Sequence, residues 1–584
     1  MDFFMKPPLA ILLSIALLLP FITGCQKLHH GSTVVASQPA PQKKTPTKPP
    51  PDPLAYYHYL VSRLKLSEGK IDDAIHQLKI TITYDAKEPT LHVELATLYI
   101  HKGRMEEAIE ECKTALHYDP DYLSAHLLLG GVYSSLRKTP QAIESYQKAL
   151  KIDPHHRESY LFLGSLYAEN GEYDKAVDLL KKFLKMEPNN VMGLYSLGRI
   201  YVETKSYEKA KEYFLKALAI EPNLSSVLMD LGILYEIQNE PEKAVESYQK
   251  ILSFDPENRM ARNRLGQIFI KKKKLDEALD QFRELQKLDS RDLNIRTKMG
   301  LIYMEQGKLD QAILEFNFVL TANPQDDRVR YYLGIAYVEK GSLDQALSEF
   351  QRIPVSSDLF ADSRRSILLI LRKQARMEEA VRILEESIRL KPGDGDLYII
   401  LAAHHEKENQ LEKALIILKK GVELNKENPE LHFQLGAIYD KLGNFDQMVS
   451  QLKEVLRLQP DHADALNYLG YSYADRGIRL QEALQLVQKA ITLKPNMGYI
   501  TDSLGWVYYK LGDYEKAVVE LEKANQLTPD DPTVTEHLGD GYQKLNRKDK
   551  ARELYEKALA LEPKGDQLER LKNKLKELQN KKKP

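Results

Sequence analysis

The sequence predicts an all-helical solenoid, a protein in which one small helical unit is repeated along the chain. The first observation is an alanine that returns about every 34 residues, from Ala74 to Ala551. The second is a set of glycine, aromatic and proline positions at fixed distances from that alanine. A fixed period of this length indicates units that cannot bury their apolar faces alone and are stabilised by stacking on their neighbours.

The alanine occupies fourteen of fifteen successive positions, with Met448 as the exception and one additional residue before Ala483. A small side chain at this position allows the two helices of a unit to approach closely. The fourteen alanines are Ala74, Ala108, Ala142, Ala176, Ala210, Ala244, Ala278, Ala312, Ala346, Ala380, Ala414, Ala483, Ala517 and Ala551.

Three other positions define the unit. Glycine usually stands twelve residues before the alanine, as at Gly130, and an aromatic residue follows three residues later, as at Tyr133. We expect the glycine to permit close packing and the aromatic ring to fill the space between neighbouring units. Proline closes most units after an acidic residue, as at Asp119 and Pro120. Proline cannot continue a helix, so it ends the second helix of the unit.

This pattern resembles the tetratricopeptide repeat (TPR), a helix-turn-helix unit, and the resemblance covers nearly all of residues 55–565. It implies an all-α, right-handed superhelical solenoid of about fifteen repeats. We expect the repeats to follow one another every 34 residues from residue 55 to 462, then a 35-residue unit at 463–497, then two more. Residues 566–584 are expected to form a capping helix and a basic tail, since leucines recur there at helical spacing.

Pro354 breaks the regular pattern, because it ends the second helix of the ninth repeat early. In the next repeat, Leu368 and Leu371 replace the usual glycine and tyrosine. We therefore predict a change of superhelical pitch, with an N-terminal arm of nine repeats at 55–360 and a C-terminal arm of six at 361–565.

The N-terminal sequence is expected to be a targeting signal. Lys6 precedes an apolar stretch, residues 9–22, that runs into an Ile-Thr-Gly-Cys sequence ending at Cys25. This resembles a bacterial lipobox, which implies that residues 1–24 are a signal peptide and that Cys25 is lipidated. The alternative is an ordinary signal peptide with a chance cysteine. Gln26 rather than aspartate follows the cysteine, which by that resemblance favours the periplasmic face of the outer membrane.

Residues 25–54 are expected to connect the lipid to the repeats. They contain seven prolines among lysine, serine and threonine, a composition typical of a disordered, extended tether. At about 3.1 Å per residue, this tether spans on the order of 90 Å. It would hold the solenoid away from the membrane surface.

The sequence contains no pattern typical of an active site. Basic and acidic residues are nearly balanced, 83 against 84, which gives no general attraction to nucleic acid. There is no phosphate-binding loop, no nucleophile elbow and no paired Cys-x-x-Cys. Cys112, the only other cysteine, is expected to be a small core residue. We therefore predict a non-enzymatic protein with no cofactor, no metal and no small-molecule substrate.

Function is then expected on the inner wall of the superhelix, which in the TPR family is lined by the first helix of each repeat. A carboxylate clamp is disfavoured, because Val93, Thr97, Leu127 and Gly131 occupy its positions. Trp506 has two readings, an exposed binding anchor or a core residue packed on the adjacent helix. The predicted partner-binding residues are Tyr195, Arg199, Met229, Asn263, Gln267, Tyr331, Asn467, Tyr471, Asp502, Trp506 and Tyr509.

Three segments, residues 352–364, 467–477 and 502–509, resemble segments of large bacterial TPR lipoproteins. That group includes an outer-membrane adaptor that holds a carboxy-terminal processing protease and presents cell-wall hydrolases to it. The resemblance implies an envelope-anchored scaffold that captures protein partners of this kind and delivers clients to a periplasmic protease. The alternative is an assembly factor for an envelope secretion or exopolysaccharide-export machine.

Overall fold

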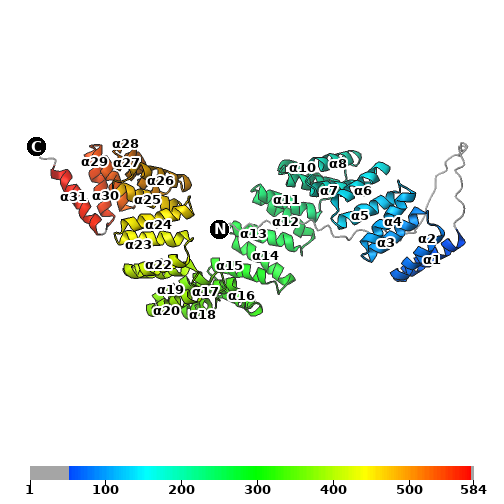
Figure 1. Ribbon diagram of the computed structural model, residues 1–584, viewed down its shortest axis with the longest axis horizontal. Helices are drawn as coiled ribbons and strands as arrows, with labels where there is room; N and C mark the ends of the chain where they lie inside the picture. Colours follow the sequence, from blue (N-terminus) through cyan, green and yellow to red (C-terminus); the bar gives the residue numbers. More distant parts are fainter. Residues whose placement is uncertain (1–51, 564, 581–584) are drawn as a thin grey trace. The chain divides into compact units, whose positions relative to one another are not determined.

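The computed structural model describes residues 52–563 and 565–580, and these residues form 31 α-helices without any β-strand (Figure 1). The helices follow one another in antiparallel pairs and end with a single helix, α31. The predicted all-helical solenoid of about fifteen repeats with a C-terminal capping helix is therefore confirmed. No helix among the described residues has both the length and the apolar composition needed to cross a membrane. Cys25 and nearly all of the predicted tether lie outside the described residues.

The described chain divides into two compact units, one ending at Ile200 and one beginning at Tyr201. The first unit contains α1 to α8 and most of α9. Its helices are α1 (Pro53–Ser67), α2 (Ile71–Tyr84), α3 (Pro89–His101), α4 (Met105–Tyr118), α5 (Leu123–Ser135), α6 (Thr139–Ile152), α7 (Arg157–Glu169), α8 (Tyr173–Met186) and α9 (Val191–Glu203).

The second unit contains α10 to α31. The helices of its first half are α10 (Tyr207–Ile220), α11 (Ser225–Ile237), α12 (Pro241–Phe254), α13 (Arg259–Lys271), α14 (Leu275–Leu288), α15 (Leu293–Glu305), α16 (Leu309–Ala322), α17 (Asp327–Lys340), α18 (Leu343–Gln351), α19 (Phe360–Lys373) and α20 (Met377–Leu390). Those of its second half are α21 (Gly395–Lys407), α22 (Leu411–Leu424), α23 (Pro429–Lys441), α24 (Phe445–Leu458), α25 (Ala463–Asp475), α26 (Leu480–Leu493), α27 (Gly498–Leu511), α28 (Tyr514–Leu527), α29 (Pro532–Lys544), α30 (Lys548–Ala560) and α31 (Asp566–Asn580).

The repeated glycine and alanine lie where the two helices of a pair meet. A Cβ atom at Gly232 of α11 would lie 2.5 Å from the ring of Tyr248 on α12, so only glycine allows this approach. Ala244, one turn before Tyr248, is fully buried. The turn between the helices places Asn239 in the left-handed region, with φ of 57°. The sequence pattern therefore reflects packing within each pair.

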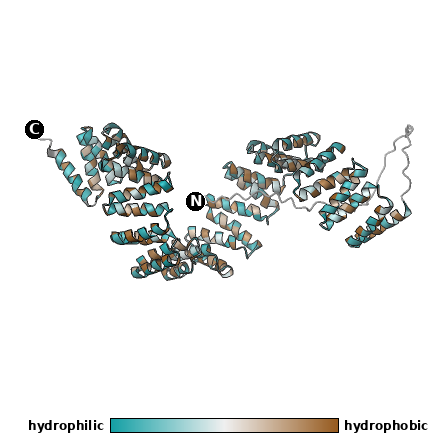
Figure 2. Ribbon diagram, in the orientation of Figure 1, coloured by the Kyte–Doolittle hydropathy of each residue, from teal (hydrophilic) through white to brown (hydrophobic). Residues whose placement is uncertain are grey.

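Each pair buries its apolar face against the next pair. Figure 2 shows apolar residues along the sides of the helices that face one another, with polar residues outside. In the first unit, Leu78 of α2, Leu95 of α3 and Cys112 of α4 belong to one buried cluster. Burial raises the pKa of the Cys112 thiol to about 12, so this cysteine behaves as the small core residue that the sequence predicts.

The second helix of the ninth repeat is short, as Pro354 predicts. Helix α18 has nine residues, whereas every other second helix has 13 or 14. Arg364 of α19 compensates for the missing turn. Its guanidinium donates hydrogen bonds to the carbonyl oxygen of Phe350 at 3.0 Å and to the Ser387 hydroxyl at 3.1 Å, and it lies 4.1 Å from the Phe360 ring. Burial lowers the pKa of Arg364 to about 10.

The predicted boundary between two arms at 360/361 falls inside the second compact unit. Helices α18 and α19 on either side of it pack together, and Phe350 and Phe360 belong to one buried cluster. A change of pitch at this point stays a prediction.

Two local features complete the array. The additional residue of the thirteenth repeat is accommodated by Arg479, which adopts a left-handed conformation with φ of 48° directly before α26. Helix α31 packs on α30 through Leu571 and Leu578, both buried, while Lys572 and Lys576 are exposed. Its polar outer face closes this end of the solenoid, as expected for a terminal cap.

Candidate partner-binding groove

The predicted groove residues lie on first helices of the repeats, and the structure gives each a distinct environment. In the first unit, Tyr195 and Arg199 are half-buried and stand one turn apart on α9. The Arg199 guanidinium lies 5.8 Å from the centre of the Tyr195 ring. A cation over an aromatic face is a mild attraction, which orders both side chains.

The predicted residues on α11 and α13 form a mixed apolar and polar surface. Met229 is buried, whereas Asn263 and Gln267 are half-buried. Asn263 accepts a hydrogen bond of 2.9 Å from Lys298 on the next first helix, α15. Burial lowers the pKa of Lys298. The amide groups of Asn263 and Gln267 and the ammonium group of Lys298 therefore stay partly accessible, whereas Met229 does not.

Tyr331 of α17 is half-buried and packs on Phe350, with the ring centres 5.3 Å apart. Its hydroxyl lies 3.4 Å from the Ser366 hydroxyl on α19, across the irregular junction. Tyr331 is therefore engaged in holding the two repeats together.

The C-terminal residues gather into an aromatic stack. The Trp506 ring lies between Tyr509, at 4.7 Å and 4°, and His537 of α29, at 4.0 Å and 14°. The Trp506 indole nitrogen donates to Asp475 at 3.3 Å, and Lys510 lies 4.9 Å from its ring. Trp506 is only 8% exposed. In this structure it is therefore packed against the adjacent helix, which was one of the two interpretations, rather than exposed as a binding anchor. Tyr509 is half-buried.

Charged groups surround this stack. The Asp502 carboxylate lies 3.0 Å from Nδ1 of His537. Burial alone would lower the pKa of His537, but Asp502, Asp540 and Glu536 outweigh it and raise the pKa. Asp502 thus holds the imidazole against Trp506 and is itself buried.

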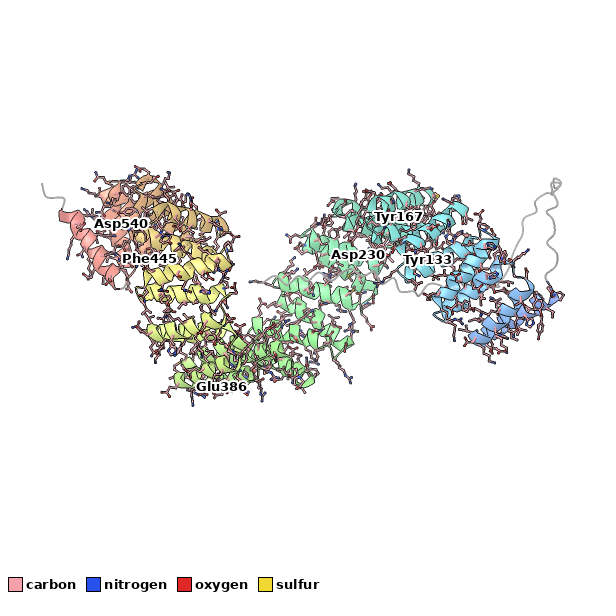
Figure 3. All side chains as sticks on the ribbon, in the orientation of Figure 1. Tyr133, Tyr167, Asp230, Glu386, Phe445 and Asp540 are labelled. Atoms are coloured by element: carbon pink, nitrogen blue, oxygen red, sulfur yellow. The ribbon has the colours of Figure 1, made fainter. Side chains whose placement is uncertain are left out.

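A second layer of acidic side chains bonds to the capping helix. Glu536, 2% exposed, accepts hydrogen bonds from Gln567, Arg570 and Lys574 of α31, the last at 2.7 Å. Burial alone would raise the pKa of Glu536, but these donors lower it to about 2. Asp540, labelled in Figure 3, also accepts from Lys574 at 2.7 Å. The cap thereby neutralises two buried carboxylates.

Asn467 and Tyr471 on α25 complete the C-terminal set. Asn467 is buried, and its Oδ1 atom has no hydrogen-bond partner among the described residues. Tyr471 is half-buried, with its ring centre 6.4 Å from that of His537. Burial, then the charges of Asp475 and Asp502, raise the pKa of Tyr471. Of Asn467 and Tyr471, only Tyr471 stays partly accessible.

The structure thus brings Tyr471, Asp502, Trp506 and Tyr509 into one cluster, whereas the other predicted residues are spread along their units. The sequence analysis missed Glu536, His537 and Asp540, and it gave the last helix only the role of a cap. The repeat frame contained the signal. Glu536 and Asp540 follow Asp502 and Trp506 by 34 residues, and Arg570 and Lys574 follow by another 34.

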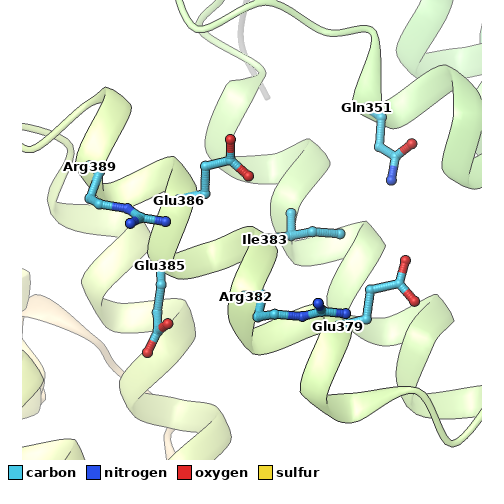
Figure 4. A pocket seen from close by; sticks show the side chains of 7 residues that line it. All are labelled: Gln351, Glu379, Arg382, Ile383, Glu385, Glu386 and Arg389. Carbon is cyan, nitrogen blue, oxygen red and sulfur yellow. The ribbon is translucent and has the colours of Figure 1, made fainter.

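A hollow of about 410 Å³ lies apart from the first-helix residues, where α18 ends early (Figure 4). Its lining is formed by Gln351, Glu379, Arg382, Ile383, Glu385, Glu386 and Arg389. The charges alternate in sign along α20, so the hollow has no marked preference for one charge.

No group of three or more metal-ligating side chains occurs within residues 52–563 and 565–580. What the first helices present is a series of half-buried aromatic, amide and charged side chains on a rigid helical frame. Such an array defines a repeat protein of the solenoid class. Its candidate binding surface extends along many repeats and is not concentrated in one pocket.

Comparison with known families identifies the repeat. The TPR domain of cytochrome c-type biogenesis protein H matches residues 105–226. Tetratricopeptide-repeat families match residues 65–131, 229–292, 297–359, 433–497 and 535–564, and a TPR-repeat family matches 505–546. The chain is a tetratricopeptide-repeat protein, and proteins with this fold bind protein partners.

Individual relatives are more distant. TPR repeat-containing protein PA4667 of Pseudomonas aeruginosa is 49% identical over 51 residues, a match that spans only 9% of either chain. Among solved structures, the APC/C hetero-tetramer Cut9-Hcn1 is 15% identical with a TM-score of 0.32, covering 84% of this chain and 98% of that one. MamA from Desulfovibrio magneticus is 25% identical with a TM-score of 0.26, covering 29% and 94%.

Proposed function

We propose that this protein is a non-enzymatic adaptor, anchored to the bacterial envelope through a lipid on Cys25, that captures segments of partner proteins along the first helices of its repeats. The observation that carries the proposal is the series of half-buried aromatic and polar side chains on these helices. Tyr471 and Tyr509, like Asn263 and Gln267, are only half-buried and so stay partly accessible. Rigid aromatic rings with adjacent polar groups are effective contacts for a peptide.

The partners proposed are a periplasmic processing protease and the cell-wall hydrolases delivered to it. A repeat array suits this task, because it can hold two proteins at once and raise their effective concentration for each other. The Cys25 lipid would restrict the encounter to the periplasmic face of the outer membrane. The partners follow from the resemblance of residues 352–364, 467–477 and 502–509 to segments of large TPR lipoproteins. The location follows from the resemblance of the sequence around Cys25 and Gln26 to a lipobox.

The second candidate is an assembly factor for an envelope machine. It is favoured by one comparison, the match of residues 105–226 to the TPR domain of a cytochrome c-type biogenesis protein. By that analogy, the repeats within residues 105–226 would bind components of a complex under assembly, such as a secretion or polysaccharide-export system, and would not deliver clients for proteolysis.

One experiment separates the candidates. The tagged, lipidated protein is purified from native envelopes after mild crosslinking, and the bound proteins are identified by mass spectrometry. Recovery of a processing protease with cell-wall hydrolases supports the adaptor, whereas recovery of secretion or export components supports the assembly factor. The Cys25→Ala protein serves as the control for anchoring, since it should be released by an alkaline wash. If it stays in the membrane fraction, the lipid anchor is wrong.

A further inference from the structure

The first helix of the array, α1, exposes an apolar surface that every later first helix keeps covered. Leu54, Tyr57 and Leu64 are 51%, 60% and 56% exposed, and half-buried Val61 lies between them. We call these four residues the α1 face; Tyr56 and Leu60 flank it and are also exposed.

The repeat frame shows what normally covers this surface. The residues of α3 that correspond to Tyr57, Val61 and Leu64 are Leu91, Leu95 and Leu98, 34 positions later. All three are buried, in one cluster with Ala74, Ile75 and Leu78 of the preceding second helix, α2. The corresponding residues of α5, Ala125, Leu129 and Val132, are buried as well. In the later repeats, a preceding second helix covers the surface that corresponds to the α1 face. The described residues contain no such helix before α1.

The sequence directly before α1 is unsuited to supply that helix. Residues 46–51 contain four prolines, and proline removes the helical N–H donor and clashes with the preceding turn. The rest of the predicted tether is largely polar, with Leu28, Val34 and Val35 as its larger aliphatic side chains before Leu54, too few for the apolar stripe of a covering helix. The occupant is therefore sought outside this stretch of chain.

The opposite end of the solenoid is also unsuited. Helix α31 presents Lys572, Asn573, Lys576 and Glu577 to solvent, so it offers polar groups rather than an apolar stripe. A head-to-tail contact between two copies would place these groups against Tyr57 and Leu64. The polar groups of α31 would then lose their bound water and gain no hydrogen bonds in exchange. A contact between the two α1 faces avoids this mismatch.

The α1 face is complementary to itself. Its residues follow one another at intervals of three, four and three, the spacing by which two helices interlock their side chains. The charges near its rim are already paired within the chain: Arg63 with Glu94 at 3.8 Å, and both Lys65 and Lys70 with Glu68. Two copies related by a two-fold axis therefore meet without opposing unpaired like charges.

We propose that the α1 face is a homodimerisation surface, in which α1 of a second copy takes the place that a preceding second helix occupies in the later repeats. This surface lies at the N-terminal end of the array. It is independent of the partner-binding residues of the proposed function, so either assignment can fail alone. A dimer would present two sets of repeats to the partners from one pair of anchors.

Cysteine crosslinking in the full-length protein tests the proposal. Leu60→Cys and Tyr57→Cys place a thiol beside and within the α1 face, and a short bis-maleimide should join two copies at these positions. Leu314→Cys on α16 is the matched control, because Leu314 is even more exposed, at 69%. The unaltered chain gives the background, which should be low since Cys112 is buried and Cys25 is expected to be lipidated. Crosslinking of the α1 variants above both controls supports the dimer.

A second measurement distinguishes a dimer from crosslinks that form in random encounters between copies. The molar mass in solution is measured by light scattering across a dilution series for the unaltered protein and for Tyr57→Glu with Leu64→Glu. We expect a dimer for the former, and a dissociation constant raised at least about tenfold for the latter at unchanged helical circular dichroism. A monomer at all concentrations, or a dimer that persists in the double variant, overturns the proposal. So does protection of Tyr57→Cys from maleimide in a monomer, since another segment or partner would then cover the face.

Discussion

The contact between the capping helix and Glu536 gives a quantitative test of how the C-terminal repeats are held together. The change is Glu536→Gln, which removes the charge and keeps the size of the side chain. In the structure, three donors of α31 lower the pKa of Glu536 from 4.5 to about 2. A shift of about 2.5 pKa units corresponds to about 3 kcal/mol between the charged and neutral forms. We therefore expect the variant to lose about 3 kcal/mol of local stability at neutral pH.

The assay uses the only tryptophan of the chain as a local probe. Trp506 is buried between Tyr509 and His537, and His537 is the neighbour of Glu536 in sequence. Urea unfolding followed by tryptophan fluorescence therefore reports on the last repeats, whereas circular dichroism at 222 nm, the usual helix wavelength, averages over the whole solenoid. Because repeat arrays need not unfold in one step, the two signals are compared separately. The fluorescence midpoint should fall clearly, and the dichroism midpoint less.

A control variant and a pH series complete the test. Glu569→Gln removes an exposed carboxylate that pairs only with Lys572 three residues away, so its effect should stay within about 0.5 kcal/mol. The folded pKa of Glu536 lies below the unfolded value, so its stabilisation is present above about pH 4.5 and is lost as the pH falls towards 2. The difference between the variant and the unaltered protein should shrink over this window. Equal midpoints at neutral pH, or a difference that persists near pH 2, would refute the reasoning.

Three further changes test other parts of the array. Gly130→Ala should destabilise the folded protein by about 1–3 kcal/mol in thermal unfolding, because its Cβ atom would lie 2.7 Å from the Tyr146 ring. The neighbouring Gly131→Ala is the control: its Cβ atom would lie 3.9 Å from the Tyr146 hydroxyl, so it should stabilise the helix by up to about 1 kcal/mol. Arg364→Met should cost about 3 kcal/mol or more and speed hydrogen exchange in α18–α20, since it removes the buried guanidinium that bonds to Phe350 of α18 and to Ser387 of α20; unchanged exchange contradicts this role. Cys112 should resist maleimide at neutral pH until denaturant is added, and rapid labelling of the folded protein would show that it is accessible.

The sequence was sufficient for the fold because each repeat position has one dominant physical requirement. Gly232 meets Tyr248, Ala244 is buried, and the residues after each second helix stop it. These contacts occur within one pair or between neighbours, so the period of the sequence specifies them. The short α18 could be predicted in the same way, since proline acts locally on its own helix.

The candidate site was predicted less completely, because its details depend on side chains from different repeats. The position of Trp506 was predicted, yet its burial follows from His537 on the next first helix. Arg364 was not singled out, since its role appears only when the structure shows it bonding to Phe350 at the end of the short α18 and to Ser387 of α20. The two carboxylates that bond to the capping helix, Glu536 and Asp540, are ordinary in sequence, and only the structure shows that they are buried beside α31. The 34-residue frame would have placed them together had each inner position been compared along the array.

The measurement that tests the central claim most directly is site-specific photo-crosslinking of partners to the first helices. A photoreactive amino acid is introduced at Gln267, a half-buried position on α13, and at the exposed Leu314 on α16, a second helix. Both variants are expressed in cells that contain the native partners, and the crosslinked proteins are identified. A scaffold that binds through its first helices predicts a defined protein crosslinked at Gln267 and not at Leu314. Equal crosslinking at both positions, or crosslinking at Leu314 alone, would contradict it.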